Sequence, residues 1–391
     1  MTPSERGAHI REAARALGFD RVGIAAAGAV DDRAHFEAWL AAGHQGDMAY
    51  METRASERAD PRDLLPGAKS VVVVAIAYAT QTTPGRPVAR YAQGRDYHNP
   101  MRRRLRKLAR AVKRREPETR TYLAVDTGPV LERYWAERAG IGWIGKASNL
   151  VTLTHSSWVL LGTLIIDRLC DYDEPTRDHC GTCDACIPVC PTRAILAPGV
   201  VDARLCISYL TIESRGGIPR ELRAAVGDHL FGCDDCQEVC PWNRFAVHSP
   251  NAMLAGRNAL ASTKVEEKNA TVALAVHLLD LDEATFVRDF EGTPFRRAGL
   301  TGMKRNALVV LGNSRDARVV PRVERVLEDD PSSMLRGHAA WALGRLGALA
   351  ALLRARTSES DNDVREEIAA ALQGALLVDD RANEAPEIAE R

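Results

Sequence analysis

The stretch CGTCDACIPVCPTRAI, residues 180–195, contains four cysteines separated by two, two and three residues, and a proline follows the fourth. A second group, CDDCQEVCP, occupies residues 233–241 and carries three more cysteines with the same closing Cys-Pro pair. The chain has nine cysteines among 391 residues, and eight of them lie between Cys180 and Cys240. Such clustering is typical of metal ligands rather than of disulfides in a chain without signs of secretion.

The cysteine spacing indicates which metal is bound. C-x2-C-x2-C-x3-C-P is the bacterial 4Fe–4S pattern, in which the fourth cysteine of each run binds the neighbouring cluster. It predicts one cluster on Cys180, Cys183, Cys186 and Cys240, and a second on Cys190, Cys206, Cys233 and Cys236. Zinc is the alternative, since two C-x2-C pairs can supply four thiolates. The third cysteine at the same interval and the repeated Cys-Pro ending favour iron–sulfur clusters, and the remaining Cys170 is expected to be a buried apolar side chain.

The bulk composition, with 46% hydrophobic and 27% charged residues, is ordinary for a soluble globular protein. The formal net charge is zero, so bulk charge indicates no partner. No apolar run reaches the length of a membrane span. The first residues, MTPSERGAHIREAARALGF, have the pattern of a charged amphipathic helix and not of a secretory signal. We therefore expect a cytoplasmic protein without a membrane partner.

Apolar runs in the N-terminal half alternate with helical patterns. The runs KSVVVVAIAYA (69–79), TYLAVD (121–126) and WVLLGTLII (158–166) predict buried strands, while residues 4–17 and 129–140 predict helices. This order favours an α/β (α+β) domain. No G-x-G-x-x-G fingerprint follows a strand, so a nicotinamide cofactor is not indicated, and another redox centre is expected.

The segment RRRLRKLARAVKRR, residues 102–115, predicts a strongly basic helix. Leu105, Leu108 and Val112 recur at helical spacing, so one face can pack while the others carry cations. A solvated surface helix is one interpretation. A helix that contacts phosphates is the other.

Three similar segments begin at Met303, Leu335 and Val364, and they predict HEAT-like helical repeats. Such repeats stack into an extended binding surface, although a packing appendage without a ligand is the alternative. The predicted layout is an α/β catalytic domain, a ferredoxin-like two-cluster module, a repeat domain and a disordered tail, at residues 1–168, 169–250, 251–378 and 379–391.

Residues 57–71, 90–98 and 126–151, together with the two cysteine groups, resemble the epoxyqueuosine reductases, which finish queuosine in the wobble position of certain tRNAs. The resemblance implies an oxidoreductase that reduces epoxyqueuosine with cob(I)alamin, held in the α/β domain and fed by two 4Fe–4S clusters. It implies tRNA as partner, and we also expect a ferredoxin- or flavodoxin-type electron donor and a monomer. One departure is Ala147, where the family often has Asn or His after the Gly-Lys pair.

The resemblance also selects site residues. Asp126, at the end of TYLAVD, is the candidate general acid, because a carboxyl with an apolar approach can arrive protonated. A helix cap for the segment starting near Pro129 is the alternative for this aspartate. The residues expected to contact cobalamin are Arg54, Arg58, Tyr97, His98, Asp126, Lys146, Ser148, Asn149 and Ser208. His98 is not expected to be an axial cobalt ligand.

Three other functions remain open from the sequence. One is a dehalogenase-like, cobalamin-dependent reductase of a small molecule. Another is a non-catalytic iron–sulfur protein that passes electrons to a partner. Such a protein would not need the Asp126 segment. The third is a zinc-stabilised tRNA-binding protein.

Overall fold

The computed structural model describes residues 1–78, 87–247 and 270–383. The chain forms two compact units. The first comprises Met1–Gly85, Arg90–Cys206 and Cys233–Asn258, and the second comprises Arg86–Ala89, Ile207–Gly232 and Ala259–Arg391. All eight predicted cluster cysteines therefore belong to the first unit, together with the α/β elements. The four-part division expected from the sequence stays a prediction, and its residues 79–86, 248–269 and 384–391 lie outside the described part.

A four-stranded sheet forms the centre of the first unit. Its strands are β1 (Arg21–Ala26), β2 (Ser70–Ala77), β3 (Thr121–Ala124) and β6 (Val159–Ile166). The order is β1-β2-β6-β3, and every neighbouring pair is antiparallel. β2 and β6 occupy the two central positions, which explains their continuous apolar sequences: every residue of β2 is buried.

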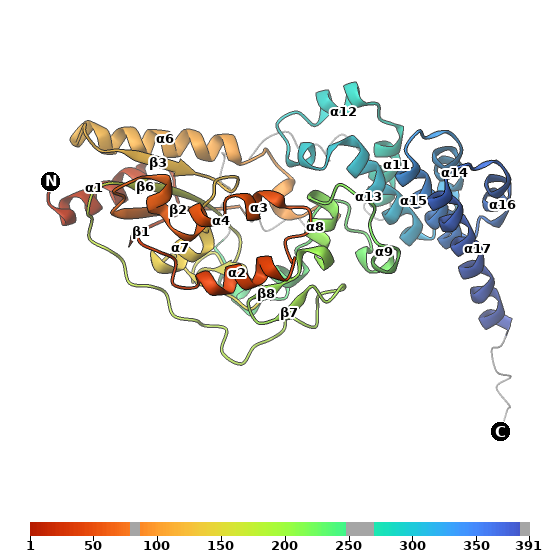
Figure 1. The fold of residues 1–391 in the computed structure, drawn as a ribbon, viewed down its shortest axis with the longest axis horizontal. Helices are drawn as coiled ribbons and strands as arrows, with labels where there is room; N and C mark the ends of the chain where they lie inside the picture. The colour runs from red at the N-terminus through yellow and green to blue at the C-terminus, as the bar shows by residue number, and fades with distance from the viewer. Residues whose placement is uncertain (79–86, 248–269, 384–391) are drawn as a thin grey trace. The chain divides into compact units, whose positions relative to one another are not determined.

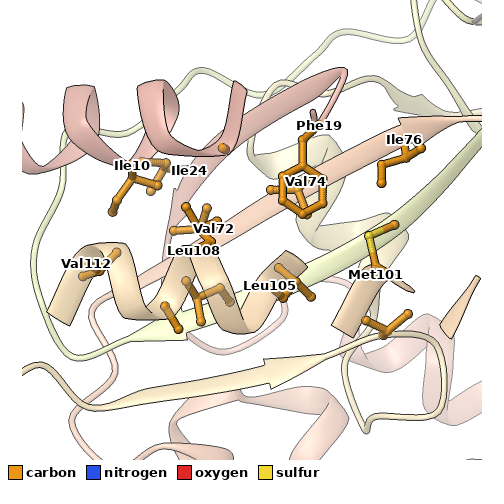
Figure 2. Close-up of a cluster of buried hydrophobic side chains, with 14 of the residues drawn as sticks. Ile10, Phe19, Ile24, Val72, Val74, Ile76, Met101, Leu105, Leu108 and Val112 are labelled. Carbon is orange, nitrogen blue, oxygen red and sulfur yellow. The ribbon is translucent and has the colours of Figure 1, made fainter. Parts of the chain in front are cut away.

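Helices cover both faces of this sheet. On one face lie α1 (Pro3–Ala16) and α6 (His98–Arg115), whose Ile10 and Leu105 pack against Val72 and Val74 of β2 (Figure 2). On the other face lies α7 (Glu132–Arg138), whose buried Trp135 joins the alternate strand residues. The predicted strands at 69–79 and 158–166 and the basic helix are confirmed within the described residues.

The basic helix α6 packs by one stripe, as its spacing predicts. Met101, Leu105, Leu108 and Val112 are buried, whereas the arginines of the opposite side are exposed. The stripe recurs every three or four residues, which is what a helix needs to present one apolar face to the sheet.

Short elements complete the first unit (Figure 1). They are α2 (Arg33–Ala41), α3 (Ala49–Thr53), α4 (Ala55–Ala59), α5 (Pro61–Leu64), β4 (Trp143–Ile144), β5 (Leu150–Val151), β7 (Ile195–Ala197), β8 (Val200–Val201) and α10 (Asp235–Glu238). The cysteine-bearing segments are mostly loops, as expected for chain that wraps metal clusters. Cys170 is buried with 4% exposure and packs in the apolar core.

The second unit is helical. Its helices are α8 (Ile207–Ile212), α9 (Arg220–Val226), α11 (Ala270–Asp280), α12 (Glu283–Asp289), α13 (Gly299–Ser314), α14 (Val320–Asp329), α15 (Ser333–Arg345), α16 (Leu349–Ser358) and α17 (Asn362–Asn383). The helices α13, α15 and α17 carry the three repeated segments and pack one on the next (Figure 1). None of the helices in the described residues has the length and apolar character that a membrane crossing requires.

A repeated Leu-Gly pair sets the spacing of these helices. Leu311 and Leu343 are fully buried, and each is followed by a glycine at a close helix contact. A Cβ on Gly312 would lie 2.7 Å from the Trp341 ring, and one on Gly344 would lie 2.8 Å from the Cβ of Ala371. The repeat is therefore one of packing as well as of sequence.

The C-terminal helix continues further than the sequence indicated. α17 ends at Asn383, so residues 379–383 are helical and do not belong to a disordered tail. Residues 384–391 of the expected tail lie outside the described part of the chain.

Candidate functional site: paired cysteine groups and an acidic loop

The first predicted cluster set surrounds a cavity of about 200 Å³. Cys180, Cys183, Cys186 and Cys240 all line it, together with His179 and Trp242. Burial raises the pKa of the Cys186 thiol, and the neighbouring Cys180, Cys183 and Cys240 raise it further. The four thiols thus meet at one cavity although Cys240 is far from the others in the chain.

The second predicted set converges in the same way. Burial raises the pKa of Cys236 to about 12, and the nearby Cys206 and Cys190 thiols add to this. Burial also raises the pKa of Cys233, and the nearby Cys236 and Cys206 thiols raise it further. Cys186 also acts on Cys236, so the two sets adjoin.

The chemistry of these donors fits iron–sulfur clusters. Buried thiols with raised pKa values ionise readily only beside a cation, and iron supplies that charge. Two N–H groups also point at sulfurs of the predicted ligand cysteines. The Ala194 N–H donates to Cys190 Sγ at 3.3 Å, and Asn149 Nδ2 donates to Cys236 Sγ at 3.7 Å. Bonds of this kind to cluster sulfurs tune a cluster's reduction potential.

Asp126 lies on a tight loop just after β3. Its backbone is left-handed, with φ of 54°, which is uncommon and strained for a non-glycine residue. The apolar surroundings expected for its carboxyl are not present: the side chain is 58% exposed, and Oδ2 lies 3.1 Å from His98 Nε2. The helix-cap alternative is wrong, because α7 begins at Glu132 with Leu131 as its N-cap.

His98, the first residue of α6, lies between two carboxylates. Asp96 Oδ1 is 2.6 Å from His98 Nδ1 and also accepts the His98 backbone N–H at 3.0 Å. Burial lowers the pKa of His98, but hydrogen bonds to Asp126 and Asp96 outweigh burial and raise it to about 9. The ring is therefore an imidazolium at neutral pH, in a continuous chain from Asp96 through His98 to Asp126.

Glu132, the first residue of α7, binds the backbone of the loop that carries Asp126. Its Oε2 accepts the Asp126 backbone N–H at 3.1 Å, so it supports the strained residue directly. Its Oε1 is buried and has no hydrogen-bond partner within the described part of the chain. Burial, with the charge of Asp126, raises the pKa of Glu132 to about 8. This carboxyl is therefore mostly protonated at neutral pH.

Three residues predicted to contact cobalamin lie on the turn between β4 and β5 and bond to the cluster-bearing segment. Lys146 Nζ donates to the Gly181 carbonyl at 2.9 Å, and Ser148 Oγ donates to the Gly199 carbonyl at 2.8 Å. Asn149 contacts the Cys236 sulfur, as described above. Within this unit these three side chains form hydrogen bonds that stabilise the cysteine-bearing segments. A cofactor contact for them stays a prediction.

The remaining predicted contacts differ in their surroundings. Arg54 forms an ion pair with Glu57, with Nε 2.5 Å from Oε2. Arg58 is buried with 4% exposure, and no carboxylate among the described residues makes an ion pair with it. Tyr97 is buried and stacks on His98, with ring centroids 4.3 Å apart. Ser208 lies on α8, in the second unit, and a cofactor contact for it stays a prediction.

Sequence reasoning missed two members of this arrangement. Asp96 immediately precedes Tyr97 and His98, and Glu132 lies six residues after Asp126, so both were within stretches that carried the resemblance. Their acidic character was the only signal, because nothing in the local pattern shows which carboxyl faces which partner.

Comparison with known families covers three parts of the chain. Residues 58–127 match the family described as epoxyqueuosine reductase QueG, DUF1730. Residues 179–243 match the 4Fe-4S double cluster binding domain, and residues 301–373 match HEAT repeats.

Curated relatives extend over most of the chain. An epoxyqueuosine reductase of Xanthomonas campestris pv. campestris is 41% identical over 355 residues, which are 88% of this chain and 97% of the relative. An epoxyqueuosine reductase of Vibrio cholerae is 40% identical over 344 residues, covering 85% of this chain and 90% of the relative.

Solved structures agree with these relatives. A crystal structure of epoxyqueuosine reductase with a tRNA-Tyr epoxyqueuosine-modified tRNA stem loop superposes with a TM-score of 0.84 and 30% identity, covering 94% of this chain and 98% of that one. An epoxyqueuosine reductase from Bacillus subtilis, with its aspartate catalytic loop swung out of the active site, has a TM-score of 0.81 and 29% identity, with the same coverage.

The α/β unit with its double-cluster module defines an iron–sulfur oxidoreductase. Helical repeats follow this core in the chain. The chain belongs to the epoxyqueuosine reductase family.

Proposed function

We propose that this protein reduces epoxyqueuosine to queuosine at the wobble position of a tRNA anticodon. The observation that carries the proposal is the identity of about two residues in five with epoxyqueuosine reductases over nearly their whole length. The related structure with a modified tRNA stem loop supports tRNA as substrate. Removing the epoxide oxygen as water takes two electrons and two protons.

The eight cysteines hold two 4Fe–4S clusters in this proposal, in the sets that converge in the first unit. Single electrons from a ferredoxin- or flavodoxin-type donor enter these clusters and pass to the reaction site. The protein acts as a cytoplasmic monomer, because one chain supplies both complete ligand sets.

Cobalamin is the proposed cofactor of the reaction site. Its amide side chains and phosphate present many acceptor oxygens, and the buried guanidinium of Arg58, which lacks an ion-pair partner in the described residues, fits such a ligand. When bound, reduced cobalamin supplies the low-potential nucleophilic chemistry that opens the epoxide. Arg58 and Tyr97 would hold it from the side of the acidic loop, which is the segment between β3 and α7 that carries Asp126.

The chain's own chemical contribution is a proton at the epoxide oxygen. Asp126 is the proposed donor, because its carboxyl is exposed at the end of a strained loop and can reach a bound nucleotide. A strained backbone that neighbouring groups hold in place is common at reacting positions. An unstacked anticodon-loop base can enter such a site while cations hold the RNA backbone.

The test combines the holoenzyme with its substrate. The anaerobically reconstituted protein is incubated with cobalamin, a low-potential reductant and tRNA that carries epoxyqueuosine, and the digested nucleosides are weighed by mass spectrometry. We expect the loss of one oxygen, dependent on cobalamin. Intact clusters and bound cobalamin without this loss would contradict the proposed substrate.

Asp126→Asn isolates the proton donor. The variant should keep both clusters and cobalamin but lose turnover by about 100-fold or more, which is typical for removal of a general acid. Asp63→Asn, at an exposed position of the same unit, is the matched control and should keep full activity. Full activity of Asp126→Asn would remove this aspartate from the mechanism.

A further inference from the structure

The arrangement around His98 raises the question of where the two protons come from. Each turnover of the proposed reaction consumes two protons at one oxygen atom, whereas a single carboxyl carries one. A donor that works twice must be reloaded between the steps, and the group that reloads it must be bonded to it. Among the described residues, the ring in contact with the Asp126 carboxyl is that of His98, with Nε2 3.1 Å from Oδ2.

The geometry points to His98 as the positioning and proton-relay residue that reloads Asp126, with Asp96 as the fixed anion behind it; this inference rests on the proposed function. Asp96 Oδ1 binds Nδ1–H at 2.6 Å and the His98 backbone N–H at 3.0 Å, so the ring cannot turn without losing a bond. Nε2 is then always the nitrogen that gives and receives the mobile proton.

The proton balance closes through this chain. In each of two transfers, the proton on His98 Nε2 moves to Asp126 Oδ2 and from the Asp126 carboxyl to the former epoxide oxygen. The first transfer gives a hydroxyl as one C–O bond breaks, and the second releases water as the other breaks. Two electrons from the external donor, through the clusters, complete the reduction to the alkene. The imidazole regains each proton from solvent, to which its side chain is 26% exposed.

The charged groups that face His98 favour a proton held on its ring. Asp96 and Asp126 bond to the ring from the loops before α6 and after β3, and Tyr97 stacks on it. Glu132 acts on the acidic loop from α7 and is mostly protonated at neutral pH. The cations that face the site act on the carboxylates: Arg102 on Asp96, Arg58 on Asp126, and Arg133 of α7 on Asp126 and Glu132. The two bonded carboxylates therefore keep the ring charged until a proton is withdrawn, in line with the high pKa of His98.

This role differs from a contact to cobalamin, and the two make different predictions for one variant. His98→Gln keeps a polar side chain of similar length but cannot carry the proton. If His98 relays protons, kcat falls by about 100-fold while the KM for the tRNA stem loop and the affinity for cobalamin stay unchanged. If His98 instead holds the cofactor, the affinity for cobalamin, followed by its absorption spectrum, falls.

The first measurement is independent of turnover. The imidazole of His98 is titrated by NMR in the histidine-labelled holoprotein and assigned with His98→Gln. We expect a pKa near 9 that falls towards the ordinary value of about 6.5 in both Asp126→Asn and Asp96→Asn. A ring that titrates near its ordinary value in the wild-type protein, or that ignores both substitutions, would overturn the relay.

The second measurement is the pH profile of kcat for conversion of the epoxyqueuosine stem loop. The wild-type enzyme should lose activity above about pH 9, as His98 deprotonates, and Asp96→Asn should move this limb to lower pH. His35→Gln, at an exposed histidine of the same unit, is the matched control and should leave the profile unchanged. An active wild-type enzyme whose His98→Gln variant is equally fast refutes the relay alone. A wild-type enzyme that never removes oxygen refutes the proposed function, and the relay with it.

Discussion

Replacing Glu132 by glutamine should change how the stability of the first unit depends on pH. Burial, together with the charge of Asp126, raises the pKa of Glu132 from 4.5 to about 8 in the folded protein. The unfolded chain therefore releases this proton near pH 4.5, whereas the folded chain holds it until about pH 8. The contribution of Glu132 to stability is fully present below pH 4.5 and is lost as the pH rises through 8.

The magnitude follows from the linkage between proton binding and folding. Between these two pKa values the wild-type protein loses about 1.4 kcal/mol of unfolding free energy per pH unit relative to a protein without this proton. From pH 5 to pH 8 the difference amounts to about 4 kcal/mol. In Glu132→Gln, one polar atom of the amide takes the buried position of Oε1, for which the described residues offer no hydrogen-bond partner. Leaving a buried polar atom unsatisfied costs roughly 1–3 kcal/mol. That cost does not depend on pH, so the slope is the quantity that tests the argument.

The assay is urea unfolding of the anaerobic holoprotein at pH 5, 6, 7 and 8, followed by tryptophan fluorescence. Trp341 is the one tryptophan of the second unit and the other five lie in the first, so the signal reports mainly on the first unit. The difference between Glu132→Gln and wild type should move by about 1.4 kcal/mol per pH unit in favour of the variant. Glu118→Gln, at an exposed glutamate, is the matched control. Parallel stability curves for Glu132→Gln and wild type would refute the buried, protonated state of Glu132.

Two further predictions concern the clusters and the RNA. Cys206→Ser should reduce the iron content from about eight to about four atoms per chain, because it removes one ligand of one cluster, while Cys170→Ser should leave iron unchanged; equal iron in both variants would contradict the ligand sets. Exchanging Arg103, Arg106 and Arg110 of α6 together for glutamine should weaken tRNA binding and reduce the slope of log K against log salt by about two to three, if each contacts a phosphate. An unchanged slope in filter binding would identify α6 as a solvated surface helix.

The features that the sequence predicted well depend on contacts close in the chain. The continuous apolar run of β2 indicates a strand buried on both faces, and the stripe of Leu105, Leu108 and Val112 indicates a helix with one packed face. The cysteine spacing depends on the size of one cluster, so it indicated the double-cluster module, while the division of the eight cysteines into two ligand sets stays a prediction. The helical repeats could likewise be predicted from the sequence, because three of its segments resemble one another.

The features that the sequence did not show depend on long-range contacts. The strand order β1-β2-β6-β3 places β6 beside strands that come much earlier in the chain, and no local pattern records that choice. The start of α7 at Glu132, rather than near Pro129, leaves Asp126 outside any cap and in a left-handed loop. The prediction of apolar surroundings for the Asp126 carboxyl was wrong for the same reason: its contact with His98 is a long-range one.

By itself, the sequence indicated the kind of chemistry: eight clustered cysteines of a double-cluster module, an acid after a buried strand, and a helical-repeat end. Only the tertiary structure decided the electrostatics of the acidic loop. The pKa of His98 is raised because Asp126, on the loop after β3, and Asp96 bond to its ring and outweigh the effect of burial. The pKa of Glu132 is raised because the fold buries its carboxyl beside Asp126. Proximity of this kind is a property of the folded chain, since charges and burial act through space and not along the sequence.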